Sequence, residues 1–364
     1  MSTPFSRSAL RLSAVALAVL FSAMGAAQAQ SQSNVTIYGA IGLDVISASH
    51  VYNGTSSGSV VKIDDNAIVN SRIGIKGDED MGGGLKAIYD LESSINPDTG
   101  SARTQFWNRG AYVGLSGGMG TIKFGQQWNV SDDYMCGYFV CAYYSPFLMG
   151  GFYALSDYYS NAIKYTSPNF GGVEGGLYYS AGERSGHSSA GQKFQAAVNY
   201  TAGPFGIGVV AFSEKDPLGI GTNTMYAVGG SYDFGPAKLR LGLATAQVDY
   251  FYAGASGNTP ESSTTTGAYK AKLIDLGVDV PITSQFSAAL DYIKKDVTDS
   301  PDDTCFLRGR ANYALSKRTS LNFNVIYLKN SGGANFAFIT DGKGFAGEAG
   351  QKQTLITAGI THSF

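Results

Sequence analysis

The chain has 364 residues, of which 26 are basic and 28 acidic, and its net charge is −2. This near-neutral balance gives no support for a nucleic-acid partner. Beyond the N-terminal segment no apolar run approaches ~18 residues, which excludes a bundle of membrane-spanning helices. The 48 glycines, 23 tyrosines and 20 phenylalanines instead favour strands and tight turns.

Residues 1–29 have the pattern of a cleaved export signal. Arg7 and Arg11 precede an apolar run from Leu12 to Phe21, and Ala27-Gln28-Ala29 is typical of an A-x-A cleavage site. The alternative, a membrane anchor, would need about 20 apolar residues, and this run is shorter. We predict cleavage within one residue of Ala29, which leaves residues 30–364 as one exported domain.

From Asn34 onward, apolar and polar residues alternate with a period of two. In the first segment Val35, Ile37, Ile41, Leu43 and Val45 share one parity, and the segments 193–200, 238–243 and 321–327 repeat the pattern. Such alternation indicates strands with one apolar and one polar face. About sixteen such strands are expected between residue 34 and Phe364.

The connections alternate in length. Short glycine-rich turns are expected near 81–84, 117–120, 170–172, 201–204, 234–236 and 281–283, and longer polar loops around 49–64, 96–103, 182–191, 214–223, 251–266 and 331–349. Alternating short and long connections are typical of an outer-membrane barrel, which must close because lipid leaves no partner for a free strand edge. The predicted fold is an all-β, 16-stranded antiparallel transmembrane barrel.

One connection, residues 129–161, is far longer than the others. A loop of this length is usually functional or disordered. Ten aromatic residues argue against disorder, because so much apolar surface must be buried. We expect this third loop to fold into the barrel lumen. Six of its aromatic residues are the main candidates for contacts there: Tyr138, Phe139, Tyr143, Tyr144, Phe152 and Tyr153.

The last strand ends on an aromatic residue. Ile356, Ala358, Ile360, His362 and Phe364 share the face expected to meet lipid, which places His362 in the polar interface of the membrane. A C-terminal Phe at this position is interpreted as an assembly signal, beyond its role as a strand residue.

Six segments resemble the strands of Gram-negative general porins, closest to the β-proteobacterial kind. They are Asn34-Val-Thr-Ile-Tyr-Gly39, Ser71-Arg-Ile-Gly-Ile-Lys-Gly77 with the turn Gly82–Lys86, Arg109-Gly-Ala-Tyr-Val-Gly-Leu115, Gly120-Thr-Ile-Lys-Phe-Gly125, Tyr165-Thr-Ser-Pro-Asn-Phe170 and Gly359–Phe364. Their order along the chain makes the resemblance more specific than any single motif.

The resemblance implies a homotrimer of passive channels for ions and small hydrophilic solutes. It further implies outer-membrane lipids and lipopolysaccharide as surroundings, and the barrel-assembly machinery as the partner of Phe364. No cofactor and no metal are implied. A general-diffusion pore is the leading interpretation, and the alternative is a substrate-preferring pore whose loop aromatics stack on sugars or aromatic solutes.

The resemblance also implies a constriction between basic wall residues and acidic loop residues. Arg72 and Arg109 match wall arginines of the family, and Lys164 falls where a basic residue is common. Lys76 and Lys86 share the inward parity, although a solvated wall position explains them equally well. Gln126 and Ala40 stand where relatives often carry a basic residue, so we expect a weaker positive cluster.

Three loop aspartates are the candidate acidic partners of the basic wall residues: Asp132, Asp133 and Asp157. The alternative is that these aspartates only keep the ends of the loop in contact with water. Cys136 and Cys141 are close enough in sequence to form a local disulfide. The sequence does not favour this disulfide over two free thiols. Cys305 would then remain unpaired.

Two other classes of protein are considered. An outer-membrane barrel enzyme needs a nucleophile with an orienting base, and the three histidines, His50, His187 and His362, fall in no such arrangement. A secreted β-rich adhesin would not need the terminal Phe or one long inward loop. If the protein were a monomer that is soluble in water, a secreted adhesin would be favoured over a pore.

Overall fold

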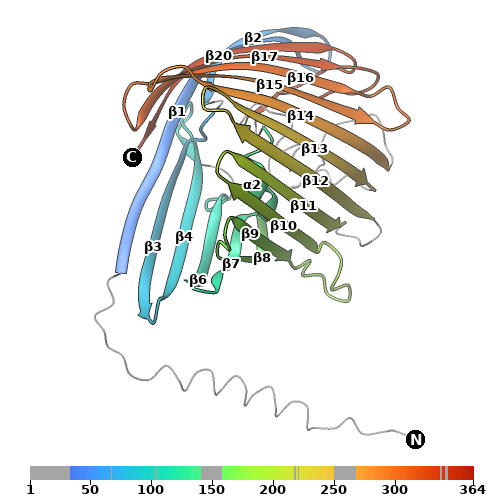
Figure 1. Cartoon of the computed structure of the whole chain (residues 1–364). Helices are drawn as coiled ribbons and strands as arrows, with labels where there is room; N and C mark the ends of the chain where they lie inside the picture. Colours follow the sequence, from blue (N-terminus) through green and yellow to red (C-terminus); the bar gives the residue numbers. More distant parts are fainter. Residues whose placement is uncertain are drawn as a thin grey trace, which may run out of the picture.

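The computed structural model describes residues 33–66, 68–102, 105–140, 158–216, 219, 221–249, 268–336, 338–340 and 343–364, with backbone alone for 102, 158, 159, 338–340, 343 and 344. Nearly all of this is strand, wrapped into a barrel with α2 inside it (Figure 1). Among the described residues no helix is long and apolar enough to cross a bilayer.

The strands follow one another around the sheet in chain order, each antiparallel to the next. Their bounds are β1 Ser33–Tyr52, β2 Ser57–Asp65, β3 Arg72–Gly82, β4 Leu85–Asn96, β5 Ser101–Ala102, β6 Gly110–Gly117, β7 Gly120–Trp128, β8 Tyr158–Thr166, β9 Val173–Ser180, β10 Lys193–Ala202, β11 Phe205–Lys215, β12 Thr222–Asp233, β13 Lys238–Val248, β14 Tyr269–Pro281, β15 Phe286–Val297, β16 Thr304–Ala314, β17 Thr319–Asn330 and β20 Lys352–Ser363. The helix α2 spans Val130–Met135, and β18 (Phe338–Thr340) pairs with β19 (Lys343–Phe345) in a small separate hairpin.

The barrel closes where β1 meets β20. These strands pair from Ala40 with Ser363 to Ala48 with Leu355, and Gly39 and Phe364 exchange backbone hydrogen bonds at the very end. On its other edge β1 pairs first with β3 and then with β2, which are two halves of one interrupted strand. Since β5 pairs only with the tip of β4, sixteen strands form the closed wall, as predicted.

The predicted alternation is confirmed. The large apolar residues of one parity are exposed on the outside, among them Val35, Ile37, Ile41, Val45, Leu239, Leu241, Leu243, Leu321, Phe323 and Val325. Aromatic side chains gather near the short turns: Tyr165, Phe170, Tyr200, Phe205, Tyr232, Phe234, Tyr313 and Phe364 are all exposed. Such a girdle is typical of residues at a membrane interface.

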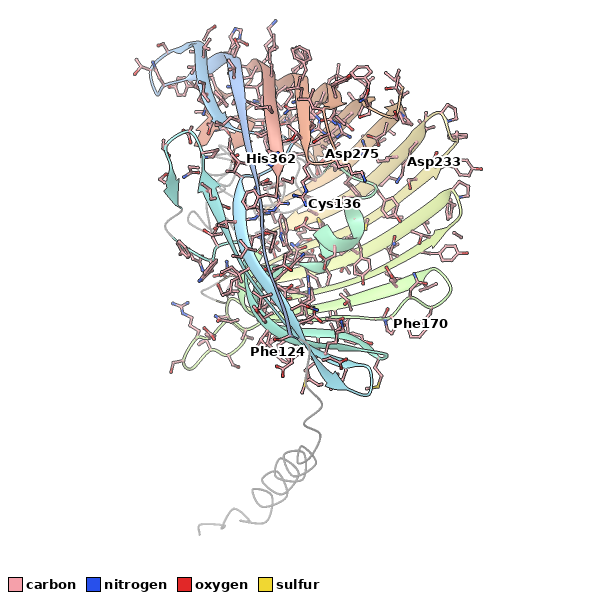
Figure 2. The ribbon with its side chains drawn as sticks, turned by 90° about the vertical axis from the view of Figure 1, so that its left-hand side faces the viewer. Phe124, Cys136, Phe170, Asp233, Asp275 and His362 are labelled. Atoms are coloured by element: carbon pink, nitrogen blue, oxygen red, sulfur yellow. The ribbon has the colours of Figure 1, made fainter. Side chains whose placement is uncertain are left out.

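The short turns lie where they were expected, and the longer connections differ in detail. Gly82, Gly83 and Gly84 all have positive φ, which explains why the first turn needs glycine. The predicted loop 49–64 is wrong: β1 continues to Tyr52 and β2 begins at Ser57, because backbone pairing extends the strands beyond the alternating pattern. Phe170 and Asp233, which flank short turns, lie along one edge of the barrel in Figure 2.

The C-terminal strand has the predicted faces. Ile356, Ile360 and Phe364 are exposed on the outer side. The ring of His362 is also exposed there, and its Nδ1 lies 2.9 Å from the hydroxyl of Thr319 on β17. The polar ring on the lipid-facing parity therefore has a partner close to the barrel end.

Candidate functional site

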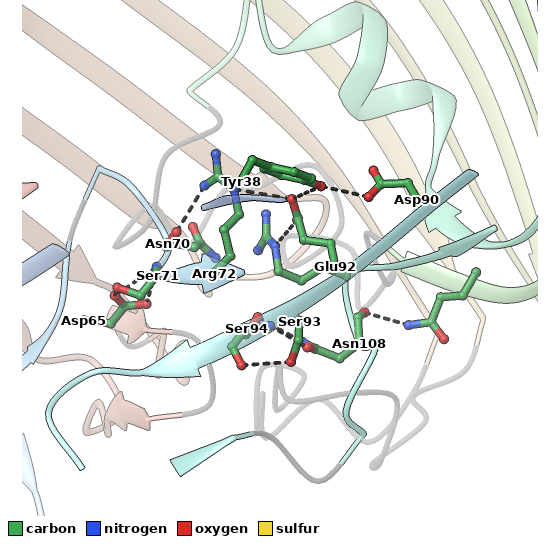
Figure 3. A network of polar contacts seen from close by, with 12 residues as sticks. Tyr38, Asp65, Asn70, Ser71, Arg72, Asp90, Glu92, Ser93, Ser94 and Asn108 are labelled. Carbon is green, nitrogen blue, oxygen red and sulfur yellow. Dashed lines mark hydrogen bonds and ion pairs between the residues drawn. The ribbon is translucent and has the colours of Figure 1, made fainter. Parts of the chain in front are cut away.

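An acidic pair on β4 is bound to side chains of β1 and β3. The hydroxyl of Tyr38 lies 2.9 Å from Asp90 Oδ1 and 2.9 Å from Glu92 Oε2, so its single proton is donated to one carboxylate or the other (Figure 3). Glu92 also accepts a hydrogen bond from Arg109 Nε, and Arg72 Nε lies 3.4 Å from Glu92 Oε2. These contacts hold both arginines against one carboxylate.

Strand register explains how these groups meet. Asp90 and Glu92 are two residues apart on β4 and therefore face the same side. Tyr38 on β1 stands opposite Gly74 on β3, and Gly74 stands opposite Glu92. The Tyr38 ring occupies the space that a side chain at Gly74 would take. The phenol can therefore cross β3 and reach β4.

Three further cations lie over aromatic rings or backbone oxygens of the same wall. Lys76 Nζ is 4.7 Å from the centre of the Tyr38 ring, and Lys123 Nζ is 4.6 Å from that of Tyr112. Lys164 is buried and donates to Trp128 O at 2.9 Å and to Asp133 Oδ2 at 2.7 Å. We call Arg72, Lys76, Arg109, Lys123 and Lys164 the basic wall cluster.

Lys86 lies apart from this cluster. It is the second residue of β4, close to the Gly82–Gly84 turn, and pairs with Asp78 at 3.0 Å in an exposed position. Gln126, which stands where relatives often carry a basic residue, donates to Asn108 O at 2.6 Å. Ala40 is buried beside Arg72, its pairing partner on β3.

The chain turns inward after β7 to form α2. Asn129 caps the helix by accepting from the backbone N–H of Asp132. Val130 and Met135 are buried, and the helix packs on the inner faces of β9, β10 and β11. Two hydrogen bonds anchor it: Ser131 Oγ donates to Gln195 at 2.8 Å, and Tyr134 donates to Gly175 O at 3.0 Å.

The aromatic residues that follow α2 pack into gaps left by wall glycines. The ring of Tyr138 occupies the side-chain space of Gly208 and Gly229, and the ring of Phe139 occupies that of Gly242. Both side chains are buried. They are therefore packing groups and present no ring to a solute.

Hydrogen bonds complete the attachment of the segment 129–140. Tyr138 donates to Asn199, and the backbone N–H of Val140 donates to Asp275 Oδ2 on β14 at 2.7 Å. Burial, with the charge of Asp133, raises the pKa of Tyr134 to about 12. The phenol therefore stays protonated, and able to donate, to a higher pH than an ordinary tyrosine. Figure 2 shows Cys136 next to α2 and Asp275 on the sheet beyond it.

A second charged network covers β13 to β16. Asp291 accepts from Arg240 Nη2 at 2.5 Å and from Arg308 Nε and Nη2 at 3.0 and 2.8 Å. Asp279 accepts from Arg240 Nε at 2.8 Å and from Arg310 Nη2 at 2.7 Å. Each carboxylate therefore has two guanidinium partners.

Several predicted site residues lie outside the described part of the chain: Cys141, Tyr143, Tyr144, Phe152, Tyr153 and Asp157. Cys136 is disulfide-bonded and Cys305 is a free thiol. The predicted end of the long loop at residue 161 is wrong, because β8 begins at Tyr158, which pairs with Trp128. Asp132 is buried near Asn129, the residue that caps α2.

Sequence reasoning missed Tyr38, Asp90, Glu92 and Lys123. Asp90 and Glu92 alternate with Tyr89 and Leu91, so parity alone would have placed them on the inner face. No feature of the sequence indicated that the Tyr38 side chain crosses β3 at Gly74.

Comparison with known proteins agrees with this architecture. The sequence profile described as Gram-negative porin matches residues 14–333. The chain belongs to that family. Outer membrane porin protein 32 of Delftia acidovorans is 30% identical over 98% of this chain and 100% of its own length, and Major outer membrane protein P.IB of Neisseria gonorrhoeae is 28% identical over 84% and 91%.

A solved porin has the same fold. The anion-selective porin from Comamonas acidovorans superposes with a TM-score of 0.77, at 25% identity, over 92% of this chain and 100% of its own. Like its family, this porin is an integral outer-membrane channel for small solutes.

Proposed function

We propose that this porin is a passive, general-diffusion channel whose lumen is narrowed by the segment 129–157, opposite the basic wall cluster. The observation that carries the proposal is the attachment of residues 129–140. Lys164 binds Asp133 on one side, and Asp275 binds the backbone of Val140 on the other. A segment bonded at both ends to well-separated strands is a fixed part of the pore.

Charge in the narrowed region favours anions weakly. The basic wall cluster has five cations, and three carboxylates lie among them: Asp90, Glu92 and Asp133. Excess positive charge in a poorly hydrated gap raises the local concentration of anions. The related porin from Comamonas acidovorans is described as anion-selective, which supports a preference for anions over cations in this porin.

The test is the reversal potential of the reconstituted pore under a potassium chloride gradient. Replacing both Arg72 and Arg109 by Gln is expected to shift the reversal potential toward cation preference. Lys86→Gln removes the same charge at the exposed turn and serves as control. An unchanged reversal potential in the double variant would show that these two arginines do not contribute to the ion selectivity of the pore.

The assembly proposed for this porin is a homotrimer in the outer membrane. Support comes from a trimeric form of the OmpT protein of Vibrio cholerae, which has the same fold with a TM-score of 0.67. We further propose that residues 1–29 are a cleaved leader and that Phe364 addresses the chain to the barrel-assembly machinery. The finished barrel would then contact outer-membrane lipids and lipopolysaccharide. Transport, without catalysis, is the proposed activity.

A further inference from the structure

Exposed lysines gather on the lipid-facing surface of one side of the barrel, near its long-loop end. They stand on β14, β15, β17 and β20, which lie next to one another with β16 among them (Figure 1). Each lysine has the outward parity of its strand, shared with exposed apolar residues such as Leu276, Leu290 and Val325. We call these lysines the outer lysine belt: Lys270, Lys272, Lys294, Lys329 and Lys352.

The belt lies at the level of the membrane head groups. Tyr292 and Tyr327, two residues before Lys294 and Lys329 on their strands, end the apolar band of the outer surface. Aromatic residues in this position mark the interface between hydrocarbon and water. Lysines just beyond them reach the head groups with their long side chains. Long connections lie on the outside of outer-membrane barrels, so the leaflet around the belt is the outer one, which consists of lipopolysaccharide.

The charge of this surface is unbalanced and local. On β14 to β17 and β20 the outward positions carry the five belt lysines and one acidic residue, Asp296. On β6 to β13 the outward positions carry one charged residue, Lys215. The positive charge is therefore confined to one side of the barrel, which a general need for hydration around the rim does not explain.

Two lysines of the belt stand directly opposite each other. Lys329 on β17 pairs with Lys352 on β20, and Cys305 connects Lys329 to Lys294 in the same row. Like charges in directly opposite positions of a sheet destabilise it. Lys294 lies 3.7 Å from Asp296 and 3.5 Å from Asp303, whereas the other four belt lysines have no ion pair among the described residues. An anion bound over the row would relieve this repulsion.

We propose that the outer lysine belt binds the phosphate groups of lipid A, the membrane anchor of lipopolysaccharide. The inference rests on the proposed contact with lipopolysaccharide and assigns that contact to one side of the barrel. Each lysine Nζ is a compact charged donor that meets a phosphate oxygen in a charge-assisted hydrogen bond. Lys329 and Lys352 together face one phosphate, because residues directly opposite in a sheet are only about 5 Å apart.

The test measures binding of lipid A to the purified porin in detergent by native mass spectrometry. Wild type should bind lipid A with both phosphates at least about tenfold more tightly than lipid A with both phosphates removed. Lys329→Gln with Lys352→Gln should lose most of this difference, because one basic residue near an anionic surface contributes about fivefold in affinity. Lys317→Gln with Arg318→Gln neutralises two exposed charges in the turn between β16 and β17, and this matched control should bind like wild type.

A second variant separates binding from folding. Lys329→Glu gives Lys352 an opposite charge across the strand pair, so the barrel should be at least as heat-stable as wild type while its affinity for lipid A falls. Equal affinity for lipid A in wild type and both belt variants would overturn the proposal, and so would an equal loss in the control.

Two competitors test the assignment to lipid A. Phosphatidylglycerol bound as tightly as lipid A would indicate a surface for any anionic lipid, and displacement by millimolar inorganic phosphate would indicate a site for free phosphate. Either result would overturn the assignment. If wild type bound neither form of lipid A, the proposed contact with lipopolysaccharide would itself be wrong. If all variants bound both forms equally, that contact would stand and the role of the belt would be wrong.

Discussion

The ring of Tyr138 lies in the space that a side chain at Gly229 would occupy. Tyr138 belongs to the inward segment, and Gly229 belongs to β12 on the barrel wall. The contact fixes how closely the segment approaches the wall. It also explains a glycine in mid-strand, where glycine otherwise weakens a sheet.

Gly229→Ala is therefore expected to push Tyr138 and the inward segment away from the wall. Overpacking of this kind typically costs about 1–3 kcal/mol. The barrel should denature at a lower temperature, and the single-channel conductance should change. Gly230→Ala, the adjacent glycine with only ordinary contacts, is the matched control. If both variants conduct like wild type, the segment does not define the pore width.

Much of the fold could be predicted from sequence because the membrane imposes a period of two. Val35, Ile37 and Ile41 meet lipid, so their parity alone gives the strand and its faces. The pattern fails at strand ends, where β1 and β2 extend into the predicted loop 49–64. There backbone pairing continues to Val51 with Gly58 and Tyr52 with Ser57, residues that have no clear alternation.

The site was less accessible to prediction. Arg72, Arg109 and Lys164 were found through family resemblance, but their partners depend on register between distant strands. Glu92 meets both arginines only because β4 pairs with β3 on one edge and with β6 on the other in a particular alignment. A one-residue change of register would turn its side chain to the lipid, and sequence alone does not specify alignment to that precision.

Glu92→Gln should shift selectivity in the direction opposite to the arginine variants. It removes one negative charge beside Arg72 and Arg109 while keeping an acceptor of similar shape. Reversal potentials in a salt gradient should move toward anion preference. Asp78→Asn, which removes the charge that pairs with Lys86 toward the end of β3, is a control that should show little change. A shift toward cations would contradict the proposed role of the pair.

Ser71 joins the two halves of the interrupted strand. Its hydroxyl lies 2.9 Å from Gly42 N and 2.6 Å from Asp65 Oδ1, and the side chain is buried. Ser71→Ala removes the acceptor of the Gly42 N–H and one donor to Asp65, and should destabilise the barrel by about 1–3 kcal/mol. Thermal denaturation in detergent measures this. The exposed Ser59→Ala variant should have the stability of the wild type. If Ser71→Ala were equally stable, the hydrogen bonds of Ser71 would not contribute to the stability of the barrel.

The state of the cysteines gives a chemical prediction. Cys136 is disulfide-bonded and Cys305 is free, so we expect Cys136 to bridge to Cys141 within the inward segment. Maleimide labelling of the denatured protein should add one label before reduction and three after it. Cys305→Ser should then give no label before reduction. Two or three labels on the unreduced wild type would contradict the bridge.

The central claim is that the chain forms an open, passive pore, and conductance in a planar lipid bilayer tests it most directly. Purified protein should produce discrete upward current steps. The current in each step should rise with voltage and with salt concentration, without any added energy source. Protein that inserts as a folded barrel but gives no such steps would contradict the account.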